Sequence, residues 1–193
     1  MKKRVGVLAL QGDFEAHERA LTIAGADVRQ VRTTADLNAV DGLVIPGGES
    51  TTMIKLLHYM DLMEPLRRFA EQKPLFGTCA GAILLAKDVL NPAQESLGLV
   101  DLTVERNAYG RHLDSRVVQL QPGAEFAERA GAGELEAVFI RAPIIRRAGS
   151  AVKVLAEYDG NPVLVEQGRY LIATFHPELT KDLRVHTLFL NKL

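Results

Sequence analysis

The fold is decided by the stretch Leu75-Phe76-Gly77-Thr78-Cys79-Ala80-Gly81-Ala82-Ile83-Leu84-Leu85-Ala86. Leu75–Thr78 is short and apolar, which predicts a buried strand, and residues 80–86 predict a helix that starts directly after Cys79. A Gly-x-Cys-x-Gly sequence between a strand and a helix is typical of a nucleophile elbow, a turn so sharp that larger neighbours would collide. The stretch therefore predicts an α/β sheet with a reactive thiol at the end of one strand.

The same alternation of strand and helix continues toward the N-terminus. Short apolar segments predict strands, and periodic apolar segments behind a polar capping residue predict helices. The expected strands are residues 5–10, Asp27–Val31 and residues 43–45. One helix is expected after the capping residue Asp13 and another after Ser50, and the helical region continues over residues 64–72. Alternating strands and helices with short loops indicate a mostly parallel central sheet with helices on both faces.

The C-terminal half is richer in predicted strands. They are residues 100–105, 116–120, 137–141, 152–157, 163–166 and 171–175. Few helices separate them, so we expect antiparallel additions to the sheet, and Thr180 can cap a last helix. The sequence has neither an internal repeat nor a low-complexity linker, and 193 residues suit one compact domain. We therefore expect a single domain spanning residues 1–193.

Composition excludes several classes of function. Lys and Arg number 23 and Asp and Glu number 24, so a net charge of −1 argues against a nucleic-acid-binding protein. No apolar run approaches the roughly 18 residues of a membrane span. A single cysteine cannot form an internal disulfide and fits a reducing cytoplasm. The six apolar residues after Lys2-Lys3-Arg4 are fewer than the about 7–15 of a secretory signal, so we interpret them as the first strand.

Cys79 is the candidate nucleophile. A lone cysteine is more often a buried structural residue. The elbow favours catalysis instead, because the N-terminus of the following helix directs amides and the positive end of its dipole at a thiolate.

A thiolate nucleophile needs a base, and His176 is the favoured one. It follows the predicted strand 171–175, and ligands gather where the strands of a parallel sheet end. Pro177 fixes the backbone after it, and Glu178 is close enough to hold the second ring nitrogen. The alternative is a solvated turn histidine. The other four histidines are weaker candidates. His17, His58 and His186 are expected to be half-buried or exposed on helices, and His112 is expected to lie in a polar loop.

The segment Pro46-Gly47-Gly48-Glu49-Ser50 follows another predicted strand. Two glycines let the backbone turn its amides into a cavity, where they could hold the oxyanion of an acyl-transfer reaction. An ordinary loop capped by Ser50 is the plainer interpretation. A nucleotide site is poorly supported, because neither G-x-G-x-x-G nor G-x-x-x-x-G-K-[ST] occurs.

Together these segments resemble the class I (triad) glutamine amidotransferases, which have a flavodoxin-like fold. More narrowly, the chain is similar to the glutaminase subunits of two-protein pyridoxal 5′-phosphate synthases. The segments that carry the resemblance are Leu10-Gln11-Gly12, Val40-Asp41-Gly42-Leu43, Pro46-Gly47-Gly48-Glu49-Ser50-Thr51-Thr52, Phe76-Gly77-Thr78-Cys79-Ala80-Gly81, Val104-Glu105-Arg106-Asn107, Phe139-Ile140-Arg141-Ala142-Pro143 and Phe175-His176-Pro177-Glu178-Leu179-Thr180.

The resemblance implies a role for each matching residue. Cys79 would attack the side-chain amide of L-glutamine, His176 would be base and then acid, and Glu178 would orient His176. Amides near Gly47 and of Ala80 would form the oxyanion hole, and Gln11 would respond to a partner protein. The residues implied in glutamine binding are Gly48, Glu49, Ser50, Arg106, Ile140 and Arg141.

The resemblance also implies a partner, a (β/α)₈-barrel pyridoxal 5′-phosphate synthase subunit that takes up the ammonia in a multi-copy complex. We expect no cofactor and no metal, since neither a phosphate motif nor zinc-ligand spacing occurs. The chain departs from the family in 109–117, where Arg116 and Val117 replace an aromatic and an acidic residue. Two alternatives stay open: a thiol hydrolase or chaperone-like protein on a related sheet, and a non-catalytic regulatory subunit.

Overall fold

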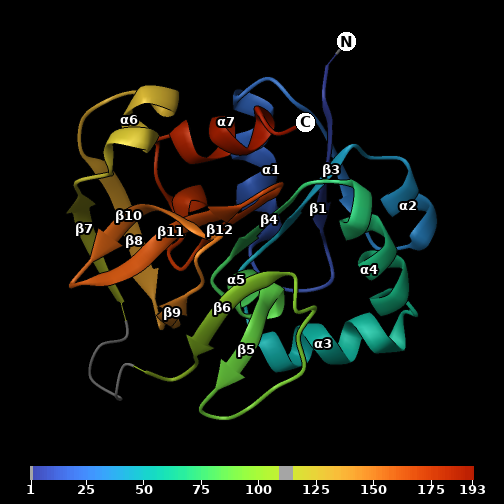
Figure 1. Cartoon of the computed structure of the whole chain (residues 1–193). Coiled ribbons are helices and arrows are strands. Elements are labelled where there is room, and N and C mark those ends of the chain that lie inside the picture. Colours follow the sequence, from blue (N-terminus) through green and yellow to red (C-terminus); the bar gives the residue numbers. More distant parts are fainter. Residues whose placement is uncertain (1, 109–114) are drawn as a thin grey trace.

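A seven-stranded sheet forms the centre of the computed structural model, which describes residues 2–108 and 115–193 (Figure 1). Its strand order is β10-β11-β12-β4-β3-β1-β2. The bounds are β1 Arg4–Leu8, β2 Asp27–Val31, β3 Gly42–Ile45, β4 Leu75–Thr78, β10 Lys153–Tyr158, β11 Asn161–Gln167 and β12 Tyr170–Ala173. The first four strands and β12 run parallel, while β11 is antiparallel to both of its neighbours. The predicted fold class, a mostly parallel sheet with antiparallel additions, is confirmed.

Helices cover both faces of this sheet. One face carries α1 (Phe14–Ile23), α6 (Ala124–Ala130) and α7 (Arg184–Leu190); the other carries α2 (Thr34–Asn38), α3 (Ser50–Tyr59), α4 (Met63–Gln72) and α5 (Ala80–Leu85). Successive side chains of a strand point to opposite faces, so Leu43 and Ile45 of β3 join one apolar core while Val44 joins the other. Two separate cores therefore clamp the buried central strands in a single register.

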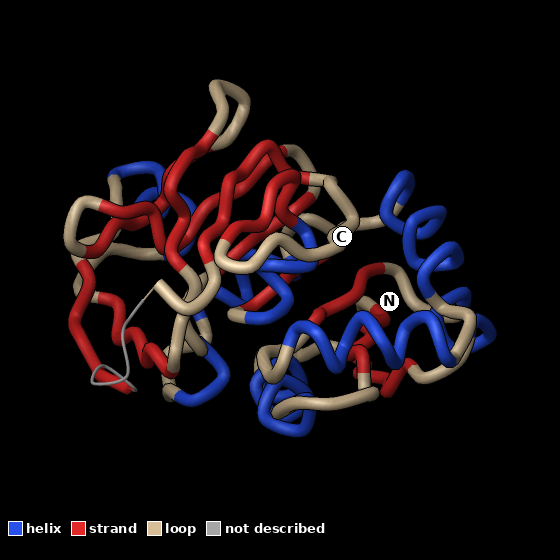
Figure 2. The backbone as a smooth tube through the Cα atoms, turned by 90° about the horizontal axis from the view of Figure 1, so that it is seen from below, coloured by secondary structure: helices blue, strands red, loops and turns tan. Residues whose placement is uncertain are grey.

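The remaining described strands form two smaller sheets. One holds β5 (Ala86–Leu90), β6 (Val100–Glu105) and β9 (Ile144–Ala148), and the other pairs β7 (Ser115–Leu120) with β8 (Leu135–Ile140). The expectation that the strands of the second half add to the central sheet is thus wrong for β6, β7 and β8, while β5 and β9 were not predicted as strands. Seen from below in Figure 2, most strands gather on one side of the molecule and most long helices on the other. Across the described residues we find no helix with the length and apolar character needed to cross a membrane.

The helix caps differ partly from the expected ones. Asp13 caps α1 as predicted, and its Oδ1 accepts a hydrogen bond from Ala16 N at 3.3 Å. Ser50 does not cap α3 but is its first residue; Glu49 is the cap, because its two carboxylate oxygens reach two backbone amides of the first turn. Thr180 does not cap the last helix, which begins only at Arg184.

Candidate active site

Cys79 stands at the turn between β4 and α5. Its φ of 48° lies in the left-handed region, where a residue with a side chain is strained. A Cβ added at Gly77 would lie 2.7 Å from the backbone of Gly81, and one at Gly81 would lie 2.2 Å from the carbonyl oxygen of Ile45. Both flanking glycines are therefore required sterically, as the predicted elbow demands.

His176 and Glu178 meet the elbow from the neighbouring strand. They lie just beyond β12, with Glu178 in the 3₁₀ turn Pro177–Leu179. His176 Nδ1 is 2.7 Å from Glu178 Oε1, and both residues are buried. The backbone of His176 is anchored as well, since its amide donates to Val138 O at 2.8 Å. The predicted imidazole–carboxylate pair is therefore formed.

The electrostatics of His176 suit a thiolate–imidazolium pair. Burial disfavours the charged ring, but hydrogen bonding to Cys79 and Glu178 outweighs it and raises the pKa of His176 to about 10. At neutral pH the imidazolium form is favoured. The residue can then deliver a proton to a leaving group.

The Gly47–Gly48 loop lies directly against the pair. A Cβ on Gly47 would sit 2.5 Å from the His176 ring and 3.3 Å from Cys79 Cβ. Gln11 holds this loop from the other side: its Nε2 donates to Gly47 O at 3.3 Å, and its Oε1 accepts from Glu49 N at 2.9 Å. Gly48 has φ of 133°, a conformation that favours glycine. Gln11 therefore sets the orientation of the peptides that face the nucleophile.

Glu49 has a structural task besides any contact with a ligand. Its Oε1 accepts from Thr51 N at 3.0 Å, and its Oε2 accepts from Thr52 N and Thr52 Oγ1, each at 2.7 Å. Burial raises the pKa of the carboxyl, but these hydrogen bonds prevail and lower the pKa of Glu49 to about 2. The group therefore stays ionised. Ser50 is buried, and its Oγ donates to Gln94 Oε1 at 3.0 Å.

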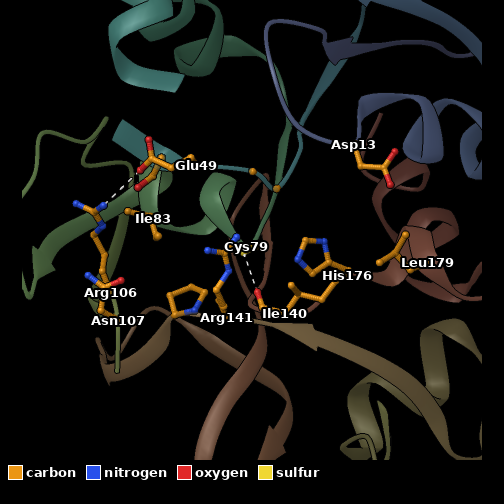
Figure 3. A pocket seen from close by; sticks show the side chains of 14 residues that line it. Asp13, Glu49, Cys79, Ile83, Arg106, Asn107, Ile140, Arg141, His176 and Leu179 are labelled. Atoms are coloured by element: carbon orange, nitrogen blue, oxygen red, sulfur yellow. Dashed lines mark hydrogen bonds and ion pairs between the residues drawn. The ribbon is translucent and has the colours of Figure 1, made fainter. Parts of the chain in front are cut away.

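A cavity of about 310 Å³ opens over Cys79 (Figure 3). Arg106 and Glu49 pair to one side of Cys79 at 3.6 Å, and His176 lies on the other side. The Arg141 side chain reaches toward Cys79, and Cys79 Sγ is 3.9 Å from Ile140 O. Within residues 2–108 and 115–193 Arg141 makes no hydrogen bond or ion pair, which leaves its guanidinium available for an anionic group.

Most of the predicted site residues line this cavity: Gly47, Gly48, Glu49, Ser50, Cys79, Arg106, Ile140, Arg141 and His176. Gln11, Ala80 and Glu178 do not line it; they lie behind the lining residues. Five residues that were not predicted from the sequence as site residues also line the cavity: Asp13, Ile83, Asn107, Pro143 and Leu179. Asn107, Pro143 and Leu179 lie within the segments that carry the resemblance, but only their closeness in the fold shows that they line the cavity.

Two buried histidines correct the sequence interpretation. His17 and His186 were expected to be half-buried or exposed, yet both are wholly buried behind Glu178. His112 and the departures in 109–114 lie outside the described residues. Arg116 contacts the Tyr158 hydroxyl at 3.1 Å, and Val117 is exposed. No group of described side chains has the arrangement of a metal site.

Comparison with known proteins decides the family. The model of the SNO glutamine amidotransferase family matches residues 7–193. The chain belongs to this family. A relative from Solibacter usitatus (strain Ellin6076), named "Pyridoxal 5'-phosphate synthase subunit PdxT", is 64% identical over 99% of this chain and 100% of its own length. The subunit of the same name from Thermosipho africanus (strain TCF52B) is 49% identical over 97% of each chain.

Solved structures agree with this family membership. A crystal structure described as a glutamine amidotransferase superposes with a TM-score of 0.88 at 46% identity and covers 97% of both chains. The structure of PurLQS from Thermotoga maritima superposes with a TM-score of 0.69 at 17% identity over 99% of each chain, and it shows the shared fold only. The predicted membership of the glutamine amidotransferases is thus confirmed.

Proposed function

We propose that the chain is the glutaminase subunit of a pyridoxal 5′-phosphate synthase. It hydrolyses L-glutamine to L-glutamate and ammonia and supplies the ammonia to a synthase partner. Family membership and the names of the relatives support the activity and the pathway. The observation that carries the mechanism is the elbow thiol beside the His176–Glu178 pair, whose nitrogen-to-oxygen distance is 2.7 Å.

Hydrolysis proceeds through a thioester. The Cys79 thiolate attacks the side-chain carbonyl carbon of glutamine, and the carbonyl electrons move onto oxygen. Amides of the Gly47–Gly48 loop and of Ala80 hold this oxyanion; Ala80 begins α5, and the first four amides of a helix have no partner within it. The oxyanion collapses, the carbon–nitrogen bond breaks, and His176 gives its proton to the departing ammonia.

Deacylation reverses the proton traffic. The neutral His176 takes a proton from water, and the resulting hydroxide adds to the thioester carbonyl. The carbon–sulfur bond then breaks, which releases glutamate and restores the thiolate beside the imidazolium. Glu178 keeps Nδ1 of His176 protonated, so that only Nε2 exchanges protons in both halves of the reaction.

The charged ends of glutamine meet opposite charges in the cavity. We assign the α-carboxylate to Arg141, whose guanidinium is unpaired among the described residues and reaches toward Cys79. Arg106 is already paired with Glu49 at 3.6 Å and with Thr51 Oγ1 at 3.1 Å. The ionised Glu49 suits the α-ammonium, while Gly48, Ser50 and Ile140 complete the wall.

Ammonia is useful to a synthase only if it arrives unprotonated, so the acceptor must be attached. We propose a (β/α)₈-barrel synthase subunit in a multi-copy cytoplasmic complex, with Gln11 as the residue that responds to it. We also propose that residues 1–193 form one domain. Strands from both halves of the chain share the central sheet, and the family model spans nearly all of it, which supports this.

Cys79→Ala tests the assignment directly. Alanine fits the elbow, so the variant should fold and bind the partner, yet ammonia release from glutamine should fall to the background of a reaction without enzyme. The assay is ammonia release by the assembled complex at saturating glutamine, with circular dichroism to verify folding. A folded variant with more than trace activity would exclude the thioester route.

A further inference from the structure

A chain of buried polar side chains continues behind Glu178. His17 of α1 places Nε2 3.3 Å from Glu178 Oε2 and 3.1 Å from Thr78 Oγ1. Its Nδ1 is 3.0 Å from Nε2 of His186 in α7. The side chains of His17, His186 and Glu178 are all buried, and the mechanism above gives the two histidines no task.

Both of these histidines are neutral. Burial lowers the pKa of His17 well below its usual value, and the neighbouring His186 and His176 lower it further. Burial alone lowers the pKa of His186 to about 4. A neutral imidazole carries one N–H and one bare nitrogen, so each ring must choose which nitrogen donates.

One assignment of the ring protons of His17 and His186 gives nearly every buried polar atom in this chain a partner. If His17 carries its proton on Nε2, that N–H faces two acceptors: Thr78 Oγ1 at 3.1 Å, with which it makes a hydrogen bond, and Glu178 Oε2 at 3.3 Å. Glu178 Oε2 has no hydrogen bond among the described residues, and His17 Nε2 lies within reach of it. His17 Nδ1 is then bare and accepts from His186 Nε2–H. The atom left over is His186 Nδ1, which has no partner in the described structure. An unpaired bare nitrogen is tolerable there, whereas the opposite tautomers bury an unpaired N–H and leave Glu178 Oε2 without a donor.

We propose that His17 is a positioning residue of the triad, whose Nε2–H is shared between Thr78 Oγ1 at 3.1 Å and Glu178 Oε2 at 3.3 Å, while His186 fixes its tautomer. The proposal rests on the glutaminase function proposed above. Glu178 is then held by a donor at each oxygen: His176 at Oε1 and His17 at Oε2. A carboxylate held at both ends cannot rotate away from His176. The hydrogen bonds run in one direction from α7 through α1 to the elbow.

Removing the His17 nitrogens should slow the reaction without weakening glutamine binding. His17→Phe keeps the ring volume but leaves Glu178 Oε2 buried without a donor, which should reduce kcat of the assembled complex about tenfold or more. KM should stay within about twofold, since His17 does not line the cavity.

His17→Gln and His58→Phe are the matched variants. Glutamine carries a side-chain N–H that can serve Glu178, so His17→Gln should recover most of the lost rate. His58 is an exposed histidine on α3, and its ring pairs with Glu95 at 2.8 Å. Its substitution should therefore leave kcat unchanged. The proposal is overturned if folded His17→Phe keeps kcat within about twofold, or if folded His17→Gln is as slow as folded His17→Phe.

A measurement on the unmutated chain does not depend on the folding of any variant. Nitrogen-15 chemical shifts of the histidine rings distinguish Nε2–H, Nδ1–H and imidazolium forms. At pH 7 His17 should give the Nε2–H pattern; an Nδ1–H or imidazolium pattern overturns the proposal. If the unmutated complex released no ammonia from glutamine, the proposed function would fail, while this spectrum would still decide the tautomer.

Discussion

At the scale of single residues, substitution removes a different function from each of the two triad partners of Cys79. His176 provides the nitrogen that moves protons, whereas Glu178 only holds that ring through the 2.7 Å contact at Nδ1. An amide in place of the carboxylate can still accept the Nδ1 hydrogen bond, although it lacks the charge. An amide in place of the imidazole cannot act as a base.

Glu178→Gln should therefore be less damaging than His176→Asn. Single-turnover rates of glutamine hydrolysis in the assembled complex would measure both, and the Asn variant should be slower by about tenfold or more. Equal rates, or the reverse order, would mean that Glu178 contributes more to the reaction than orientation.

At the scale of elements, the loop after β3 depends on a side chain from the loop after β1. Gln11 makes a hydrogen bond to each end of the segment Gly47–Glu49. Glycine peptides rotate at low cost, so these two bonds decide which way the amides near Gly47 point. A partner that repositions Gln11 could present or withdraw an oxyanion donor, which changes the rate by roughly 10²–10³.

We expect the isolated chain to be a poor glutaminase and the synthase partner to activate it. Ammonia release at saturating glutamine should rise by roughly 10²–10³ on mixing, if one donor is supplied. A free-chain rate within about twofold of the complexed rate would contradict a switch of this kind, because one missing donor costs far more.

Gln11→Ala should reduce this stimulation by about tenfold or more, since the loop then lacks the side chain that relays the partner. The ratio of complexed to free rates is the measurement. Gln119→Ala provides the control. Gln119 is exposed on β7, and its side chain donates a hydrogen bond to Glu136 across that hairpin, far from the Gly47–Glu49 loop in the sequence, so the ratio of this variant should match that of the unmutated chain. If the two variants have equal ratios, Gln11 is not the relay.

Local sequence patterns predicted the bounds of those strands whose ends are marked by nearby residues. Leu75–Thr78 and Asp27–Val31 match the structure to the residue. Pro74 and the elbow at Cys79 bound the first, and Gly25 lies shortly before and Arg32 directly after the second. β5 was missed because it continues straight from α5 without a breaking residue, and α6 because it is only seven residues long.

Gly47, Cys79 and His176 converge because β3, β4 and β12 end at one edge of the parallel sheet. Arg106 and Arg141 instead follow β6 and β8 of the smaller sheets, and only the packing of those sheets brings them to the cavity. His17 falls on the apolar face of α1 between Phe14 and Leu21, so its burial was open to prediction from periodicity. Its partner His186 was not, because the two lie 169 positions apart and only the packing of α1 near α7 joins them. The capping role of Glu49 was missed for a local reason: α3 begins one residue earlier than expected, at Ser50, so the amides of Thr51 and Thr52 face the Glu49 carboxylate.

At the scale of the whole molecule, burying neutral histidines makes the folded state sensitive to acid. The unfolded chain binds a proton at His186 below a pH of about 6.5, whereas the folded chain binds it only below about 4. The unfolded state therefore holds more protons between these values, and stability falls as pH falls. The loss from His186 alone is about 3 kcal/mol across this window. His17 acts in the same direction.

His186→Phe should flatten this dependence. Urea unfolding from pH 7 to pH 4 would give the free energy of unfolding of the variant and of the unmutated chain, and the variant should lose less of it. His58→Phe, which alters an exposed histidine, should keep the original slope. An unchanged slope in His186→Phe would show that this ring takes up its proton as readily in the folded chain as in the unfolded one.

Cys79 is the single thiol of the chain, and it stands at the elbow. Any reagent specific for thiols therefore reacts with one atom per molecule, and with that atom only when the cavity above it is open. The number of labels bound per chain counts the competent sites in a preparation without reference to a catalytic rate. The speed of labelling, followed with and without the synthase partner or glutamine, reports on access to the sulfur under each condition. The chain thus contains a built-in stoichiometric probe that needs neither an engineered cysteine nor the removal of a native one.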